Sequence, residues 1–174
     1  MFWSQENVDK FPRCTLHMKT TLQPDVLKKQ RKKIYDAFVK ACEDEARAVR
    51  ALRWGNDPDV GAAHGIITIG QRKMCGFNPP EFFNQNARKV IISDIRIIPL
   101  EACVDATDMF NNQTRFECTL LHELVHVVRS DARKPDVNWD FPDSEEPGNQ
   151  FELWAYGRLL CTEADVADAQ ATIF

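Results

Sequence analysis

The feature that most constrains this chain is the segment TLLHELVHVVRSD at residues 119–131, where two histidines stand four residues apart within an apolar pattern. Apolar residues recur there at helical spacing, which predicts a helix over about residues 113–129 with one buried face. Thr114 and Glu117 have the spacing of a capping box, which predicts the start of that helix. Because residues i and i+4 lie one above the other on a helix, His122 and His126 can both face one ion.

The order His122-Glu123-Leu-Val-His126 also places a glutamate directly after the first histidine. A catalytic zinc ion takes three protein ligands and keeps one position for water. Glu123 would project beside that ion, where it can take a proton from the water and hand it to a leaving amine. The pattern therefore predicts one Zn²⁺, with His122 and His126 as ligands and Glu123 as the general base. The alternative is an amphipathic core helix whose histidines are structural.

A third ligand has to come from elsewhere in the chain. His17 and His64 both precede the motif, and ordinary structural or surface roles are expected for them. A carboxylate is therefore expected to complete the site. The candidates are Asp131, Asp136, Asp140, Asp143, Glu145, Glu146 and Glu152.

Among these carboxylates, Glu152 is the preferred ligand because it stands near the start of the next predicted helix, where packing can fix its orientation. Glu152 can instead cap that helix together with Asn149, or lie in solvent. Asp131 is predicted to point away from the metal, and the acids of the loop remain open. Tyr156 lies four residues after Glu152 on the same helix face, so its phenol is predicted to hydrogen-bond a developing oxyanion; a core position is the alternative.

The rest of the chain predicts an α+β fold, with a small sheet backed by the motif helix and a C-terminal helix in one domain, residues 1–174. Residues 1–23 are left open as extended or peripheral. The expected elements are a helix at 24–54, a loop at 56–65, strands at 65–70 and 89–100, an irregular stretch at 75–87, a polar loop at 130–148 and a helix from about Asn149.

Composition and charge limit the kinds of partner and cellular compartment that can be expected for this protein. A net charge of −4 gives no indication of a nucleic-acid surface, and no stretch reaches the ~18 apolar residues of a membrane span. The start MFWSQENVDK does not have the form of a secretory signal. Six cysteines without a C-x-x-C pair fit either disulfides or buried thiols.

TLLHELVH, followed by a loop and PGNQFELWAYG, resembles the zincin metallopeptidases, and most of all the deuterolysin and peptidyl-lysine metalloendopeptidase group, the aspzincins. Over residues 89–160, Gly148, Tyr156 and Gly157 match a Gly-Thr…Asp-x-x-Tyr-Gly segment of that group. Leu153 replaces its aspartate and Asn149 its threonine, so that Glu152 would supply a gluzincin-like third ligand. The resemblance implies a zincin-like domain with endopeptidase activity.

The leading functional prediction is therefore a zinc-dependent metalloendopeptidase that hydrolyses peptide bonds of a protein or peptide substrate through a metal-activated water. It would be a secreted protease, or a toxin or effector module that a carrier delivers outside the producing cell. The alternative is a non-enzymatic binding protein on the same scaffold, and a third possibility is hydrolysis of a non-peptide amide.

Overall fold

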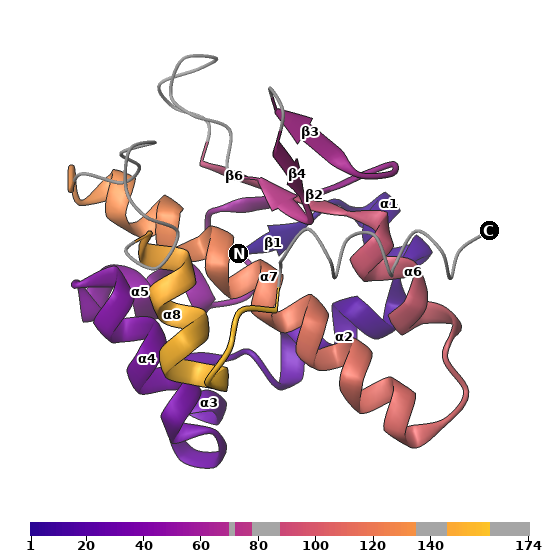
Figure 1. The fold of residues 1–174 in the computed structure, drawn as a ribbon, viewed down its shortest axis with the longest axis horizontal. Helices are drawn as coiled ribbons and strands as arrows, with labels where there is room; N and C mark the ends of the chain where they lie inside the picture. The colour runs from indigo at the N-terminus through magenta and orange to yellow at the C-terminus, as the bar shows by residue number, and fades with distance from the viewer. Residues whose placement is uncertain (70–71, 78–87, 135–145, 161–174) are drawn as a thin grey trace.

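The polypeptide is built around one long helix, α7 (Ala106–Asp131), which crosses the middle of the molecule and carries both motif histidines (Figure 1). The computed structural model describes residues 1–69, 72–77, 88–134 and 146–160. The other helices in these ranges are α1 (Gln5–Lys10), α2 (Pro12–Thr20), α3 (Pro24–Gln30), α4 (Lys32–Cys42), α5 (Glu45–Leu52), α6 (Asp94–Ala102) and α8 (Pro147–Tyr156). Among the described residues, no helix is both long and apolar enough to cross a membrane.

A small sheet lies along one side of α7. Its strands are β1 (Phe2–Trp3), β2 (Asp59–Ala63), β5 (Gly76–Phe77) and β6 (Lys89–Ser93), in the order β1-β2-β6-β5. β1, β2 and β6 run parallel to one another, and β5 is antiparallel to β6. β3 (Ile67–Ile69) and β4 (Arg72–Met74) form a separate hairpin. Val90 and Ile92 of β6 are fully buried, and both β5 and β6 contact α7. The predicted α+β class is confirmed.

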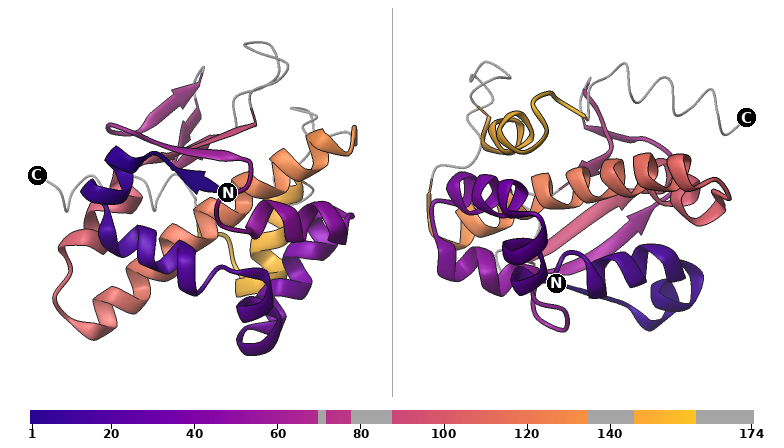
Figure 2. Two further views of the ribbon diagram at one scale, coloured as in Figure 1. Left: turned by 180° about the vertical axis from the view of Figure 1, so that it is seen from behind. Right: turned by 90° about the horizontal axis from the view of Figure 1, so that it is seen from below.

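Helices α4, α5 and α8 pack on α7 at one end of the molecule, and α2 and α6 pack on it at the other (Figure 1, Figure 2). Residues 1–23 take part in the core rather than lying apart from it. Trp3 stacks on Phe116 of α7, and Met1, Cys14 and Met18 are completely buried. The described cysteines, Cys14, Cys42, Cys75, Cys103 and Cys118, form no disulfides with one another, and Cys161 lies outside the described residues.

The single helix predicted for residues 24–54 is wrong, because the chain breaks twice and forms α3, α4 and α5. The first break is at Arg31, whose backbone is not helical. The guanidinium of Arg31 pairs with the buried Glu117 of α7. The second break is at Glu43, which adopts a left-handed conformation with φ 53°. The Glu43 carboxylate binds Arg129 and Lys134, so tertiary contacts hold a conformation that helical periodicity does not reveal.

The strand predicted at 89–100 is also only half correct. β6 ends at Ser93, whose hydroxyl accepts the amide of Ile95 and caps α6, and Pro99 lies inside that helix. The isoleucine-rich run has no period that separates a buried strand from a buried helix. The loop predicted at 56–65 contains β2, the irregular stretch contains β5, and the strand predicted at 65–70 contains β3.

The predicted start of the motif helix is corrected as well. Asp105 caps α7 by accepting the amides of Thr107 and Asp108, eight residues before the predicted start. Thr114 lies inside the helix and donates to the carbonyl of Phe110. A serine, threonine or aspartate inside a helix can therefore imitate a cap when the amphipathic pattern is weak at the true end.

Candidate metal centre

His122 and His126 project from α7 toward the amino-terminal end of α8. The two rings lie 5.1 Å apart, centroid to centroid. Glu146, directly before α8, places one carboxylate oxygen 3.0 Å from Nε2 of His126 and the other 3.6 Å from Nε2 of His122. The three side chains are 10–18% exposed, so the site is largely enclosed and still reachable from solvent.

These three side chains form a group whose ligand atoms all lie within 4.8 Å of one another. Two imidazoles and one carboxylate are a ligand set that catalytic zinc sites use, and they leave a coordination position for water. The residues at this place therefore fit a divalent metal ion, with Nε2 of each histidine and the carboxylate of Glu146 as donors.

The position of Glu146 is set by its second task as the cap of α8. Its two oxygens accept the backbone amides of Gly148 (2.7 Å) and Asn149 (2.6 Å), while Pro147 opens the helix. Gly148 allows this end of the helix to approach the metal centre, since a Cβ there would lie 2.5 Å from ring atoms of His122. The helix start and the histidines are therefore packed directly on each other.

The ionisable side chains of this site shift one another's pKa. Burial by itself would lower the pKa of His122, but the hydrogen bond with Glu152 and the charges of Glu146 and Glu123 outweigh it and raise this pKa to about 9. Burial would raise the pKa of Glu146, but the hydrogen bond with His126 and the nearby charge of His122 lower it to about 2. The metal-free site thus favours an ionised Glu146 beside a protonated His122, and a metal ion would have to displace the proton of that ring.

Glu152, the predicted third ligand, lies beside His122 but on the other edge of its ring. Its Oε1 is 2.8 Å from Nδ1 of His122, and its Oε2 accepts the amide of Leu160 at 2.5 Å. The side chain is completely buried. The structure therefore brings Glu152 to the site, while the group of close ligand atoms contains Glu146 in its place. A ligand role for Glu152 stays a prediction from the sequence.

The predicted base, Glu123, is 4% exposed and lies against β5. A Cβ at Gly76 would be 2.8 Å from Cγ of Glu123 and 2.9 Å from its Oε1. The same Cβ would also be 2.8 Å from Cγ2 of Thr119. Gly76 therefore lets the edge strand of the sheet pass directly over the glutamate of the motif.

Tyr156 is placed in a different polar cluster. Its hydroxyl donates to Oε1 of the fully buried Glu117 at 2.8 Å, and Oε2 of Glu117 also binds His17 and Arg31. Burial and the neighbouring charge of Glu117 raise the pKa of Tyr156 well above its usual value, so the phenol stays protonated. The oxyanion role stays a prediction, and in this structure the hydroxyl is used to bind Glu117.

The remaining histidines have the ordinary roles expected of them. His17 binds Glu117 in the cluster just described. His64 is almost fully exposed and pairs with Asp94 at the start of α6, at 2.7 Å. Neither is part of the close group of ligand atoms formed by His122, His126 and Glu146.

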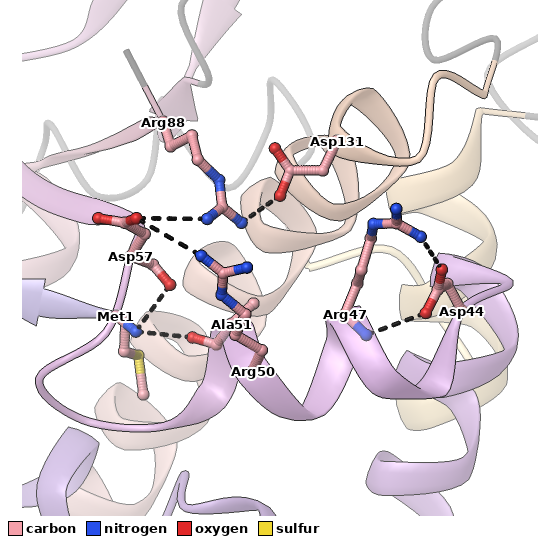
Figure 3. A network of polar contacts seen from close by, with 8 residues as sticks. All are labelled: Met1, Asp44, Arg47, Arg50, Ala51, Asp57, Arg88 and Asp131. Carbon is pink, nitrogen blue, oxygen red and sulfur yellow. Dashed lines mark hydrogen bonds and ion pairs between the residues drawn. The ribbon is translucent and has the colours of Figure 1, made fainter. Parts of the chain in front are cut away.

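Asp131 ends α7 and pairs with Arg88, which also binds Asp57 near the start of β2 (Figure 3). The amino group of Met1 donates to Ala51 in the same region. Asp131 therefore anchors the carboxyl end of the motif helix, in keeping with the prediction that it points away from the metal. Asp136, Asp140, Asp143 and Glu145 lie outside the described residues.

Sequence reasoning gave Glu146 no preference among the acids of the loop, although a local signal for it exists. Proline is common at the first position of a helix and a carboxylate is favourable at its amino-terminal end, and Glu146-Pro147 has that form. A helix that begins near Asn149, as the sequence predicts, leaves Glu146 inside the polar loop at 130–148 with no helix to fix its side chain. The actual helix begins at Pro147 and holds Glu146 as its cap.

Comparison with known proteins adds an independent finding. No curated protein and no solved structure matches the chain. The model of one protein family, described as metallopeptidase toxin 3, matches residues 7–157, which contain all described helices from α2 to α8 and strands β2 to β6. This chain, with its paired histidines and adjacent carboxylates, belongs to the metallopeptidase toxin 3 family.

Proposed function

We propose that this chain is a zinc-dependent endopeptidase that cleaves a protein of a target cell. The observation that carries the proposal is the group of His122, His126 and Glu146, whose ligand atoms lie within 4.8 Å of one another beside the HExxH glutamate. Family membership supports a metal-dependent peptidase toxin, and zinc is proposed because two imidazoles with one carboxylate suit it.

We assign the third ligand to Glu146 rather than to Glu152. Both Nε2 atoms lie near the carboxylate of Glu146, whereas Glu152 is bonded to Nδ1 of His122. A histidine that binds a metal through Nε2 usually donates its Nδ1 proton to a carboxylate or carbonyl. Glu152 then holds the ring of His122 in the tautomer and orientation that present Nε2.

Bound zinc would lower the pKa of a water molecule and polarise the carbonyl of the scissile bond. Glu123 takes the proton from the attacking water on one carboxylate oxygen and later gives it to the nitrogen of the leaving amine. Its nearly complete burial and the contact with β5 restrict the carboxylate to one place. Such fixed orientation is what general-base catalysis requires.

As a member of a toxin family, the chain would act after delivery outside the producing cell, and we propose that a carrier brings it there. The likeness to the aspzincins over residues 89–160 supports an endopeptidase rather than an exopeptidase, and carries over no preference for a particular residue at the cleavage site.

The test compares wild type with Glu123→Gln, using a peptide library made from digested cell extract as the substrate and mass spectrometry to identify new termini. Glu123→Gln should keep one zinc per chain and lose cleavage by about 10²–10⁴-fold, the usual contribution of a general base. Glu45→Gln, at an exposed glutamate of α5, is the matched control and should cleave like wild type.

An active Glu123→Gln variant would overturn the mechanism. Stoichiometric zinc in a wild-type protein that produces no new termini would instead support the non-enzymatic binding protein.

A further inference from the structure

Arg96 is a charged residue inside the apolar run IISDIRIIPL, and it is 2% exposed. It lies in the first turn of α6, and its Nη2 donates to the carbonyl oxygen of Leu160 at 2.9 Å. An arginine in such a place loses much of its hydration, and a buried guanidinium is therefore expected to have a defined task.

Leu160 is brought to Arg96 by the way in which α8 ends. Gly157 adopts a left-handed conformation with φ 79° and closes the helix, and the chain then turns back and passes across α7 (Figure 1). Leu160 is buried, and its amide donates to Oε2 of Glu152 at 2.5 Å. Both backbone groups of this one residue are thus bonded, the carbonyl to α6 and the amide to α8.

The second oxygen of Glu152 continues the connection to the metal centre. Its Oε1 lies 2.8 Å from Nδ1 of His122. Because Glu152 is completely buried, water does not compete with Leu160 and His122 for its two oxygens. Three hydrogen bonds therefore join Arg96 to His122 through the backbone of Leu160 and the carboxylate of Glu152.

We propose that Arg96 is a positioning residue for His122, acting through Leu160 and Glu152. The inference rests on the proposed function to the extent that His122 is a metal ligand. Arg96 holds the returning chain in place, the amide of Leu160 holds one oxygen of Glu152, and the other oxygen fixes the His122 ring. Without Arg96, the segment after Gly157 loses its anchor on α6 and Glu152 gains a second orientation.

The expected loss of Zn²⁺ affinity depends on how many hydrogen bonds separate the replaced residue from His122. Replacing a direct partner of a metal-binding histidine typically costs about 10–100-fold in metal affinity. Arg96 acts two hydrogen bonds further away, so we expect Arg96→Met to weaken Zn²⁺ binding by roughly three- to tenfold. Arg96→Lys keeps a donor for the Leu160 carbonyl and should recover most of this loss.

The experiment uses two readouts on the whole chain. The first is the exchange rate with water of the His122 Nδ1 proton, followed by nitrogen-15 NMR in zinc-free protein and assigned with His122→Gln. The second is Zn²⁺ affinity, measured by competition with a chelator. Arg96→Met should accelerate exchange several-fold and lower the affinity, and Arg96→Lys should return both toward wild type.

Arg13→Met is the matched control. Arg13 also donates from its guanidinium to backbone carbonyls at the end of α6, those of Leu100 and Cys103, but has no hydrogen bond to Glu152 or Leu160 among the described contacts. Its variant should lower stability while leaving both readouts at wild-type values. If Arg96→Met does not fold, Leu160→Pro removes the amide that Glu152 accepts and should produce the same two changes.

Wild-type exchange and wild-type Zn²⁺ affinity in Arg96→Met would overturn the proposal and leave Arg96 a purely structural residue. A wild-type protein that binds no Zn²⁺ would refute the proposed function instead. In that case the exchange of the Nδ1 proton in zinc-free protein still decides whether Arg96 positions His122.

Discussion

Two glutamates flank His122, and exchanging each for glutamine should separate a metal ligand from the residue that orients a ligand. Glu146 lies near Nε2 of both histidines, and Glu152 is bonded to Nδ1 of one. Both substitutions remove one charge and keep the shape of the side chain. We therefore expect Glu146→Gln to lose more zinc affinity than Glu152→Gln, and Glu152→Gln to lose more free energy of unfolding than Glu146→Gln.

For Glu146→Gln the main loss is zinc affinity. Structural zinc sites gain about 10–16 kcal/mol from four ligands, which is roughly 2.5–4 kcal/mol for each ligand, or about a hundred- to a thousandfold in affinity. The glutamine oxygen can still accept an amide at the start of α8, so the cost of the weakened cap should be about 1 kcal/mol in zinc-free protein.

For Glu152→Gln the expected loss of stability is larger than for Glu146→Gln. Both carboxylate oxygens receive a hydrogen bond in a fully buried place, one from the amide of Leu160 and one at His122. The amide nitrogen of glutamine would face one of these donors with a donor of its own, which costs about 1–3 kcal/mol. Zinc affinity should fall by about 10–100-fold, as for other partners of metal-bound histidines.

The assay combines Zn²⁺ competition against a chelator with urea unfolding of the zinc-free proteins. Glu146→Gln should show the larger loss of affinity and Glu152→Gln the larger loss of unfolding free energy. The reasoning is refuted if Glu146→Gln binds Zn²⁺ as tightly as wild type while Glu152→Gln binds none, because Glu152 would then be the third ligand that the sequence predicted.

Further outcomes are expected at Gly148, at Gly76 and for the charge of His122. Gly148→Ala places a methyl group 2.5 Å from the His122 ring, so Zn²⁺ affinity should fall at least about tenfold, with a stability cost of about 1–3 kcal/mol. Gly76→Ala pushes on Glu123 and should lower kcat by roughly 10²-fold in peptide cleavage while zinc content is retained. Because the pKa of His122 is raised from 6.5 to about 9 in zinc-free protein, the protonated ring contributes stability that is complete below pH 6.5 and is lost as the pH rises through 9. Zinc must displace that proton, so Zn²⁺ affinity measured between pH 7 and 9 should rise by up to about tenfold per pH unit.

The spacing of the motif predicted the pair of histidines and the helix that carries them, because helical geometry alone determines which residues share a face. It could not choose between Glu146 and Glu152. The roles of the two glutamates depend on where α8 begins and on the amide of Leu160, which lies eight residues after Glu152. The breaks at Arg31 and Glu43 depend likewise on partners in α7 that are distant in sequence.

The close contact of Gly148 with His122 has a consequence for recognising related chains. The segment EPGNQFE at residues 146–152 contains an acidic helix cap, a residue without a side chain two positions later, and a buried glutamate four positions after that. Each of the three is dictated by a contact with the histidines of α7, and none depends on the length of the connection between the two helices. A search for HExxH followed at any distance by E-x-G-x-x-x-E should therefore detect the same centre in sequences that are too divergent for overall similarity, and the glycine should tolerate no exchange even though its backbone conformation is helical.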